Sequence, residues 1–124
     1  MGASTPSELI ELFSQYFADG DLDGLMTLYE DDAVFPTHSG VASGLTEVRG
    51  VLKGYIDSGA KLTFGKSVAF QAGDLGLVQN AWVIELADGG QGEGVTVEVA
   101  RRQADGTWKY SIDSPDGAAL IKDE

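Results

Sequence analysis

The sequence predicts an α+β fold in which three N-terminal helices pack on a strongly curved, mostly antiparallel sheet and enclose a pocket. Apolar residues recur at helical spacing only before residue 60, whereas from Lys61 onward they alternate with polar ones over four long segments. Helices and strands segregated along a chain in this way are typical of the α+β class. The 124 residues are expected to form a single domain, 1–124, large enough to bury a core of its own.

The segment 5–20 predicts the first helix. Thr5 is a capping residue, Pro6 suits the first helical position, and Glu8 completes a capping box with Thr5. The apolar face of this helix consists of Leu9, Leu12, Phe13, Tyr16 and Phe17. Gly20 is expected to end the helix.

The segment "DLDGLMTLYEDD" predicts a second helix after a short break. Asp21 is its expected cap. Its apolar side is expected to carry Leu22, Leu25, Met26 and Tyr29. The segment "AVFPTHSG", residues 33–40, then predicts a short strand. Because proline cannot donate to a strand ladder, Pro36 places this strand at the edge of the sheet or ends it there.

The segment 44–59 predicts a third helix with Thr46 as its cap. Its inward side chains are expected to be Val48, Val51, Leu52 and Tyr55. Two internal glycines, Gly50 and Gly54, lower the helical propensity of this segment.

Four strands are predicted over residues 61–73, 75–89, 93–106 and 107–115, separated by turns rich in glycine and aspartate. The pair Asp105-Gly106 is typical of a hairpin turn, because it accepts positive φ. The tail, 116–124, is expected to be mostly unstructured or to form a loose final turn.

Composition excludes several classes of function. Twenty acidic against eight basic residues give a formal charge of −12, which repels nucleic-acid phosphates and anionic membrane surfaces. With no cysteine and one histidine, neither a thiolate site nor a transition-metal site is expected, and no cofactor is predicted. The N-terminus lacks the basic region and the apolar core of a secretory signal, so a cytoplasmic protein is expected.

The stretches "GDLDGLMTLYEDDAVF" and "RRQADGTWKYSID", with the order of elements around them, resemble the nuclear transport factor 2-like superfamily. This superfamily includes ketosteroid isomerase and the SnoaL-like polyketide cyclases, and the chain looks most like its small stand-alone YybH-like domains. The resemblance implies a cystatin-like cone with a pocket between the first helix and the sheet. It also implies a homodimer through the outer face of the sheet. It does not fix the activity, because one such fold hosts many functions.

The resemblance to ketosteroid isomerase implies three catalytic positions, which are a carboxylate base, a phenol and a protonated carboxylic acid. The base position falls at Thr37, with the neighbouring His38 as an alternative whose ordinary pKa suits proton transfer. The phenol position falls on Phe13, with Tyr16 one turn further along the same face. Because Thr37 is no base at neutral pH, the isomerase reaction itself is not expected. A rim position for His38 and a core position for Tyr16 remain open.

The acid position falls on Glu98, and strand alternation supports it independently. Val95, Val97 and Val99 share one face of a strand, whereas Thr96, Glu98 and Ala100 share the other. If the valine face is the outer one, Glu98 points into the pocket, where burial would keep its carboxyl protonated. A solvent-exposed Glu98, or one paired with arginine, is the alternative.

Other residues are expected to line the pocket. Asn80, Trp82 and Ile84 share one strand face, which lines the pocket if it is the concave one, and core packing is the alternative for Trp82. Asp113 is expected to form a turn at the strand end before Pro115, and the resemblance implies that this position closes the pocket mouth. Arg101 and Arg102 must point to opposite faces, and one of them is expected to pair with surface acids. The predicted pocket lining comprises Phe13, Tyr29, Phe35, Tyr55, Asn80, Trp82 and Asp113.

Three functions remain open from the sequence. The first is a pocket that binds a small apolar or amphipathic molecule. The second is a cofactor-independent acid–base enzyme (an isomerase, cyclase, dehydratase or hydrolase) in which His38 moves the proton while Glu98 and Tyr16 stabilise an oxyanion. The third is a non-catalytic module that associates with a partner through the valine-rich sheet face. The sequence identifies neither the ligand nor the reaction.

Overall fold

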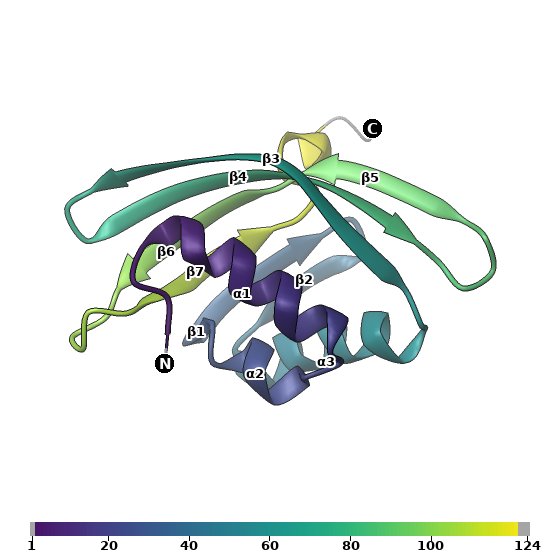
Figure 1. The fold of residues 1–124 in the computed structure, drawn as a ribbon, viewed down its shortest axis with the longest axis horizontal. Coiled ribbons are helices and arrows are strands. Elements are labelled where there is room, and N and C mark those ends of the chain that lie inside the picture. Colours follow the sequence, from purple (N-terminus) through teal and green to yellow (C-terminus); the bar gives the residue numbers. More distant parts are fainter. Residues whose placement is uncertain (1, 122–124) are drawn as a thin grey trace.

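The computed structural model describes residues 2–121, and these form helices packed on one mixed sheet (Figure 1). The α+β class predicted from the sequence is confirmed. In the first half of the chain the elements are α1 (Pro6–Ala18), α2 (Leu22–Met26), β1 (Tyr29–Thr37), β2 (Gly40–Ser43) and α3 (Leu45–Asp57). In the second half they are β3 (Lys61–Ala72), β4 (Leu75–Glu85), β5 (Gln91–Val95), β6 (Val97–Arg102), β7 (Trp108–Ser114) and a short 3-10 helix, η1 (Gly117–Ile121).

Helix α1 begins as its sequence predicts. Oγ1 of Thr5 accepts a hydrogen bond of 3.3 Å from the Glu8 amide, and Pro6 occupies the first turn. The Glu8 carboxylate returns to the amide of Ser4, at 2.6 Å, one residue before the expected partner. These contacts satisfy amides that the first helical turn leaves without partners.

Two predictions in the following helices were wrong. The amide of Gly24 donates to Asp21 as expected, but α2 ends at Met26, and Tyr29 is the first residue of β1. Thr46 does not cap α3, because that helix starts at Leu45 after Gly44, whose φ of 84° only glycine adopts readily.

The stretch "AVFPTHSG" lies in a hairpin rather than at a sheet edge. β2, which was not predicted, pairs with β1 from Val34 to Thr37 and forms the edge instead. Pairing of β1 with β7 extends to Val34, so Pro36 lies beyond the part of β1 that has a strand on both sides. His38 and Ser39 form the turn of this hairpin.

The sheet has the strand order β2-β1-β7-β6-β4-β3, with β5 also paired to β4. Only the β1–β7 pair is parallel among the described strands. The predicted strand over 93–106 is in fact two strands, because the chain changes its place on β4 at Thr96. β5 pairs with residues 81–85 of β4, and β6 pairs with residues 75–78.

Helices α1, α2 and α3 lie on one side of the sheet, and the long strands β3 and β4 arch over α1 (Figure 1). The core lies between these layers and includes Leu9, Leu25, Leu28, Leu52, Trp108 and Tyr110. Of the predicted tail, residues 117–121 form η1, and residues 122–124 lie outside the described residues. Within residues 2–121, no helix has the length and apolar character needed to cross a membrane.

Candidate functional site

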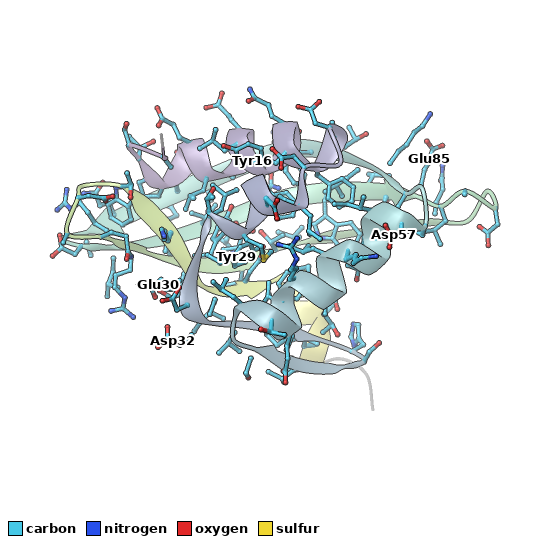
Figure 2. All side chains as sticks on the ribbon, turned by 90° about the horizontal axis from the view of Figure 1, so that it is seen from below. Tyr16, Tyr29, Glu30, Asp32, Asp57 and Glu85 are labelled. Carbon is cyan, nitrogen blue, oxygen red and sulfur yellow. The ribbon has the colours of Figure 1, made fainter. Side chains whose placement is uncertain are left out.

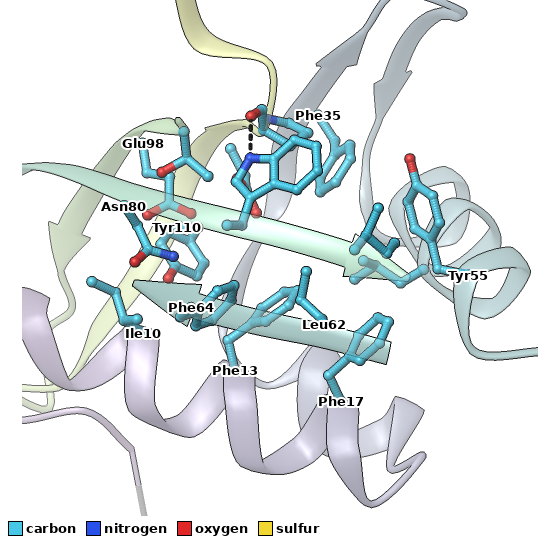
Figure 3. Close-up of a pocket in the computed structure, with 16 residues that line it drawn as sticks. Ile10, Phe13, Phe17, Phe35, Tyr55, Leu62, Phe64, Asn80, Glu98 and Tyr110 are labelled. Atoms are coloured by element: carbon cyan, nitrogen blue, oxygen red, sulfur yellow. Dashed lines mark hydrogen bonds between the residues drawn. The ribbon is translucent and has the colours of Figure 1, made fainter. Parts of the chain in front are cut away.

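A cavity of about 120 Å³ lies between α1, α3 and the inner face of the sheet (Figure 3). Its wall is apolar except at one end. The lining residues are Ile10, Phe13, Phe17, Phe35, Leu52, Tyr55, Leu62, Phe64, Asn80, Trp82, Ile84, Thr96, Glu98, Tyr110, Asp113 and Pro115.

The two ends of the cavity differ in polarity. Figure 3 shows Glu98, Asn80 and Tyr110 together at one end, and Phe17, Leu62 and Tyr55 at the other. Glu98 and Asn80 are buried, with 5% and 2% of their surface exposed, whereas Tyr55 is 37% exposed. We therefore call the first the inner end and the second the mouth.

Strand alternation explains which side chains reach the inner end. Thr96, Glu98 and Ala100 are buried, while Val95 on the opposite face is exposed. The face carrying Glu98 is thus the one that the helices cover. The same alternation on β4 turns Asn80, Trp82 and Ile84 toward the cavity.

The inner end holds two carboxyl groups on adjacent strands. Glu98 of β6 and Asp113 of β7 are directly opposite in the strand register. Behind them, the Tyr29 hydroxyl donates a hydrogen bond of 2.5 Å to Oδ2 of Asp113. Both carboxyls are almost entirely buried, with Asp113 only 4% exposed.

Burial raises the pKa values of both carboxyl groups, but not equally. Desolvation raises the pKa of Asp113 to about 6, against the lowering effect of hydrogen bonds from Tyr29 and Glu98. Desolvation, and then the charge of Asp113, raises the pKa of Glu98 well above its ordinary value. Within the pair, Glu98 is therefore the carboxyl that holds its proton more strongly, and Asp113 is the one that ionises more readily.

The indole of Trp82 forms part of the cavity wall, and a hydrogen bond holds it in place. Its indole N–H donates a hydrogen bond of 2.7 Å to the backbone oxygen of Pro115, drawn as the dashed line in Figure 3. Gly94 lies opposite Trp82 in the strand register, and a Cβ at Gly94 would approach the indole to 2.7 Å. Glycine at this position therefore gives the indole its space.

Two residues considered for catalysis lie away from the cavity. His38 is in the β1–β2 turn with 41% of its side chain exposed, and its Nε2 lies 3.6 Å from Oδ2 of Asp116. Tyr16 packs over Gly24 of α2, where a Cβ would come within 2.5 Å of the tyrosine ring (Figure 2). Neither residue lines the cavity, and neither does Thr37.

The remaining predicted lining residues divide into two groups. Phe13, Phe35, Tyr55, Asn80, Trp82 and Asp113 line the cavity. Tyr29 does not line it but supports Asp113 from behind. Asp113 was expected to form a turn at the strand end or to close the mouth, and it instead lies at the inner end, because β7 continues through it to Ser114.

Sequence reasoning missed Tyr110 and Thr96 as members of the site. The alternation on β7 could have indicated Tyr110, since Trp108 and Tyr110 share a parity and both are buried. Thr96 was already on the same face as Glu98, but its position between β5 and β6 was not foreseen.

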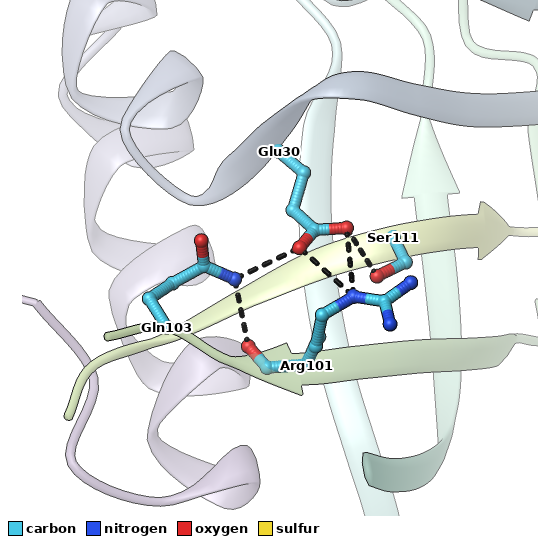
Figure 4. Close-up of polar contacts among 4 residues, drawn as sticks. All are labelled: Glu30, Arg101, Gln103 and Ser111. Atoms are coloured by element: carbon cyan, nitrogen blue, oxygen red, sulfur yellow. Dashed lines mark hydrogen bonds and ion pairs between the residues drawn. The ribbon is translucent and has the colours of Figure 1, made fainter. Parts of the chain in front are cut away.

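A second polar cluster lies outside the cavity on β1, β6 and β7 (Figure 4). The Glu30 carboxylate accepts hydrogen bonds from Ser111 Oγ at 2.6 Å, Gln103 Nε2 at 2.9 Å and Arg101 Nε at 3.1 Å. Arg102 pairs separately with Asp74 and lies over the Trp108 ring. Both arginines thus bind acids away from the pocket.

The described residues contain no group of three or more acidic, histidine or cysteine side chains placed to hold a metal ion.

The fold and the site together define a small α+β protein with an apolar cavity and an acidic inner end. The SnoaL-like domain family matches residues 10–111, and the chain belongs to that family. This confirms the resemblance inferred from the sequence motifs.

Solved structures show the same fold. An NTF2-like protein of unknown function from Pseudomonas putida KT2440 has a TM-score of 0.76 at 21% identity, with 87% of this chain and 80% of that one covered. A protein of unknown function with a cystatin-like fold from Nostoc punctiforme PCC 73102 has a TM-score of 0.75 at 15% identity, covering 87% and 84%. A ketosteroid isomerase-like protein from Erwinia carotovora atroseptica SCRI1043 has a TM-score of 0.71 at 18% identity, covering 87% and 89%.

At these identities the likeness concerns the fold alone. No curated protein matches the chain.

Proposed function

We propose that this protein binds a small, mostly apolar molecule in its cavity, as a pocket protein of the SnoaL-like type. The observation that carries the proposal is the polarity of the cavity wall. Aromatic and aliphatic side chains form most of it, and a few buried polar groups gather at the inner end. Such a wall is typical of small-molecule sites, where apolar contact supplies affinity and a few polar groups fix orientation.

Binding is the function that the site supports best, because the catalytic set suggested by ketosteroid isomerase is incomplete here. Of His38, Tyr16 and Glu98, only Glu98 lines the cavity. An apolar cavity with fixed walls requires none of the missing groups in order to bind a ligand.

The test is a titration with 2-phenylethanol, followed by the indole N–H resonance of Trp82 in a 15N-labelled sample. The chain has two tryptophans, so Trp82→Phe assigns the resonance. We expect the Trp82 resonance to shift with saturation, and that of Trp108, which is buried outside the cavity wall, to stay unchanged. Absence of a shift at Trp82 would contradict the proposal.

A matched pair of variants separates the cavity from the outer surface. Ile84→Phe adds volume to the cavity wall, whereas Val83→Phe adds it to the opposite face of the same strand. We expect Ile84→Phe to weaken binding of 2-phenylethanol and Val83→Phe to leave it unchanged. Thermal unfolding of both variants checks that the fold is intact.

A second candidate function is general acid–base catalysis, favoured by the unequal protonation of the two carboxyls. In this proposal Asp113, with its pKa of about 6, accepts a proton from the substrate. Once Asp113 has taken up this proton and lost its charge, the O–H of protonated Glu98 turns from Asp113 to the oxyanion and donates a hydrogen bond to it. The proton taken by Asp113 returns to the substrate at another atom, or at the same one.

Exchange of α-hydrogens tests this second candidate without knowledge of the substrate. The probe is 1-indanone in D₂O, observed by proton NMR. Asp113 would remove the α-proton to give an enolate, and a deuteron would return to that carbon. Catalysis predicts exchange faster than in buffer and its loss in Asp113→Asn. Exchange at the buffer rate would leave binding alone as the function.

We also propose that two copies of the chain associate through the outer face of the sheet. Phe70, Leu77, Val99 and Ile112 are consecutive neighbours in register across β3, β4, β6 and β7. Phe70 is 60% exposed, and Leu77 and Ile112 are also exposed. An apolar row of this length on an exposed sheet face is typical of an interaction surface. Pairing with a different protein is the alternative.

A further inference from the structure

The inner end of the cavity has three buried oxygen atoms without a hydrogen-bond partner within residues 2–121. They are Oδ1 of Asn80, Oγ1 of Thr96 and Oε1 of Glu98. All three residues line the cavity, and each is at most 5% exposed. A buried polar atom without a partner is unfavourable, so three of them on one wall indicate a site made for a polar group.

The backbone holds these three residues together. The amide of Thr96 donates a hydrogen bond of 2.9 Å to the backbone oxygen of Asn80, which joins β4 to the junction of β5 and β6. Glu98 follows two residues later on the same face. Because the residues lie on paired strands, the oxygens are presented without any loop movement.

All three oxygens are able to accept a hydrogen bond. Asn80 Oδ1 is an amide carbonyl oxygen, and the hydroxyl of Thr96, whose proton can turn toward the Glu98 carboxyl, has two lone pairs that accept. Glu98, when it carries the proton, directs its O–H toward Asp113 and retains a carbonyl oxygen as an acceptor. The missing partner is therefore a group that donates several hydrogen bonds at once.

The charge at the inner end of the cavity indicates whether the missing donor group is positively or negatively charged. Of the described residues that line the cavity, none is a lysine, an arginine or the histidine. The buried Asp113 carboxylate accepts a hydrogen bond from Tyr29, and Glu98 lies opposite it in the strand register. No cationic side chain among the lining residues balances its charge. A buried anion without a counter-charge attracts a cation and repels a second anion.

The walls suit a cation with an apolar body. Phe13 and Phe64 pack with their ring centroids 5.9 Å apart, and Trp82 and Tyr110 add further aromatic surface. Aromatic faces attract cations as well as apolar groups. From the inner end to the mouth, the wall changes from acceptor oxygens to aromatic and aliphatic carbon (Figure 3).

We propose that the ligand is an apolar primary amine, whose ammonium group binds Asn80, Thr96 and Glu98 at the inner end while its apolar part extends toward Tyr55. The three N–H donors of an ammonium match the three acceptor oxygens. The negative charge of the Glu98–Asp113 pair balances the positive charge of the ligand. This inference rests on the proposed binding function and specifies the class of molecule bound.

Three probes of the same size test the proposal by calorimetry at pH 7.5. They are 2-phenylethylamine, 2-phenylethanol and phenylacetate, which carry a cation, a neutral hydroxyl and an anion on one hydrocarbon frame. We expect the amine to bind at least about tenfold more tightly than the alcohol, and phenylacetate not to bind.

Variants connect this preference to the named atoms. Thr96→Val removes one acceptor at nearly constant volume, and Thr63→Val makes the same change on the exposed outer face of β3. We expect Thr96→Val to weaken amine binding severalfold and Thr63→Val to leave it unchanged. Asp113→Asn removes the charge and should abolish the preference for the amine over the alcohol. Circular dichroism verifies that each variant is folded.

The pH dependence gives a second readout. The titratable side chains near the ammonium site are Glu98, Asp113, Tyr29 and Tyr110, with Tyr55 at the mouth. As the pH rises through about 6, Asp113 gains its charge while the amine keeps its own. Affinity for the amine should therefore increase from pH 5 to pH 7, and affinity for the alcohol should not.

The outcomes separate this inference from the proposal on which it rests. Equal affinities for amine and alcohol, or tighter binding of phenylacetate, would overturn the amine assignment and leave a binding cavity in place. Failure of all three probes to bind would overturn both. A preference for the amine that disappears in Asp113→Asn would support both.

Discussion

The phenol of Tyr29 and the carboxylate of Asp113 form a buried hydrogen bond of 2.5 Å between residues 84 positions apart in the chain. Tyr29 begins β1 and Asp113 lies near the end of β7, and these two strands form the parallel pair of the sheet. Pairing of β1 with β7 thus brings a hydrogen-bond donor to a carboxylate that has little access to water. Tyr29, which does not line the cavity, therefore stabilises the Asp113 carboxylate at the inner end.

Tyr29→Phe should destabilise the fold and make Asp113 harder to ionise. The lost hydrogen bond involves a charged acceptor, so we expect a decrease of about 1.5–3 kcal/mol in the free energy of unfolding at pH 7. The pKa of Asp113 should rise above about 6, because the donor that lowers it is gone. Urea unfolding measures the first effect, and 13C NMR of the side-chain carboxyl measures the second.

Tyr110→Phe is the matched control for this prediction. Tyr110 is also a buried phenol near the carboxyl pair, but no hydrogen bond joins it to Asp113 in the described part of the chain. We expect a smaller change in the pKa of Asp113 than in Tyr29→Phe. Equal changes in the two variants would argue against a specific role of the Tyr29 hydroxyl.

Stability should depend on pH through the buried Asp113. Its pKa in the folded state, about 6, is above its ordinary value of 3.8, so protons favour the folded state. The stabilisation is complete below about pH 4 and is lost as the pH rises through about 6, with a magnitude of roughly 3 kcal/mol. Urea unfolding between pH 4 and pH 8 measures it.

Asp113→Asn removes this group and should reduce the pH dependence over that range, leaving the part that the raised pKa of Glu98 contributes. Asp32→Asn removes an exposed carboxylate from β1 and should leave the slope nearly as it is in the parent protein. A parent protein whose stability increases steadily from pH 4 to pH 7 would contradict this account of Asp113.

The sequence predicted the elements well where local rules decide them. The capping of α1 by Thr5 and of α2 by Asp21 follows from side chains within three residues of each helix start. The inward face of Glu98 follows from strand alternation, which the sheet preserves across Thr96 even though the strand is interrupted there.

Positions that depend on distant parts of the chain could not be predicted in the same way. The early end of α2 and the role of Tyr29 depend on pairing with β7, more than 80 residues away. The position of Asp113 at the inner end of the cavity depends on how far β7 continues under the helices. His38 was a candidate because it is the single histidine, but it lies in the β1–β2 turn, away from the cavity.

Glu30→Gln should destabilise the protein although Glu30 lies outside the cavity. Partial burial opposes its ionisation, but hydrogen bonds from Ser111 and Gln103 and the charge of Arg101 lower its pKa overall. The stabilisation is therefore present above the ordinary pKa of a glutamate and lost as the pH falls through the lowered value. We expect a loss of about 1–2 kcal/mol at pH 7, measured by urea unfolding.

Asp32→Asn again serves as the control, because Asp32 is an exposed carboxylate two residues further along β1 (Figure 2). Its replacement should change the free energy of unfolding by less than about 0.5 kcal/mol. A loss in Asp32→Asn as large as that in Glu30→Gln would show that the charge alone, and not the hydrogen-bonded cluster, matters.

Leu77→Glu should dissociate the proposed dimer. It places a charge in the middle of the apolar row formed by Phe70, Leu77, Val99 and Ile112. Sedimentation velocity at micromolar concentration should show a dimer for the parent protein and a monomer for Leu77→Glu. Val41→Glu, at an exposed position on β2, should remain dimeric. A monomeric parent protein would contradict the proposal and favour a different partner for this face.

The most direct test of a ligand-binding cavity is the position of a bound molecule. Intermolecular nuclear Overhauser effects between 2-phenylethylamine and the methyl groups of the 13C-labelled protein report that position. The account predicts contacts from the aromatic protons of the ligand to Leu62 and Ile84, and from its α-methylene protons to Thr96. Contacts to Val68 and Leu77 on the exposed outer face instead, or none to the cavity wall, would contradict it.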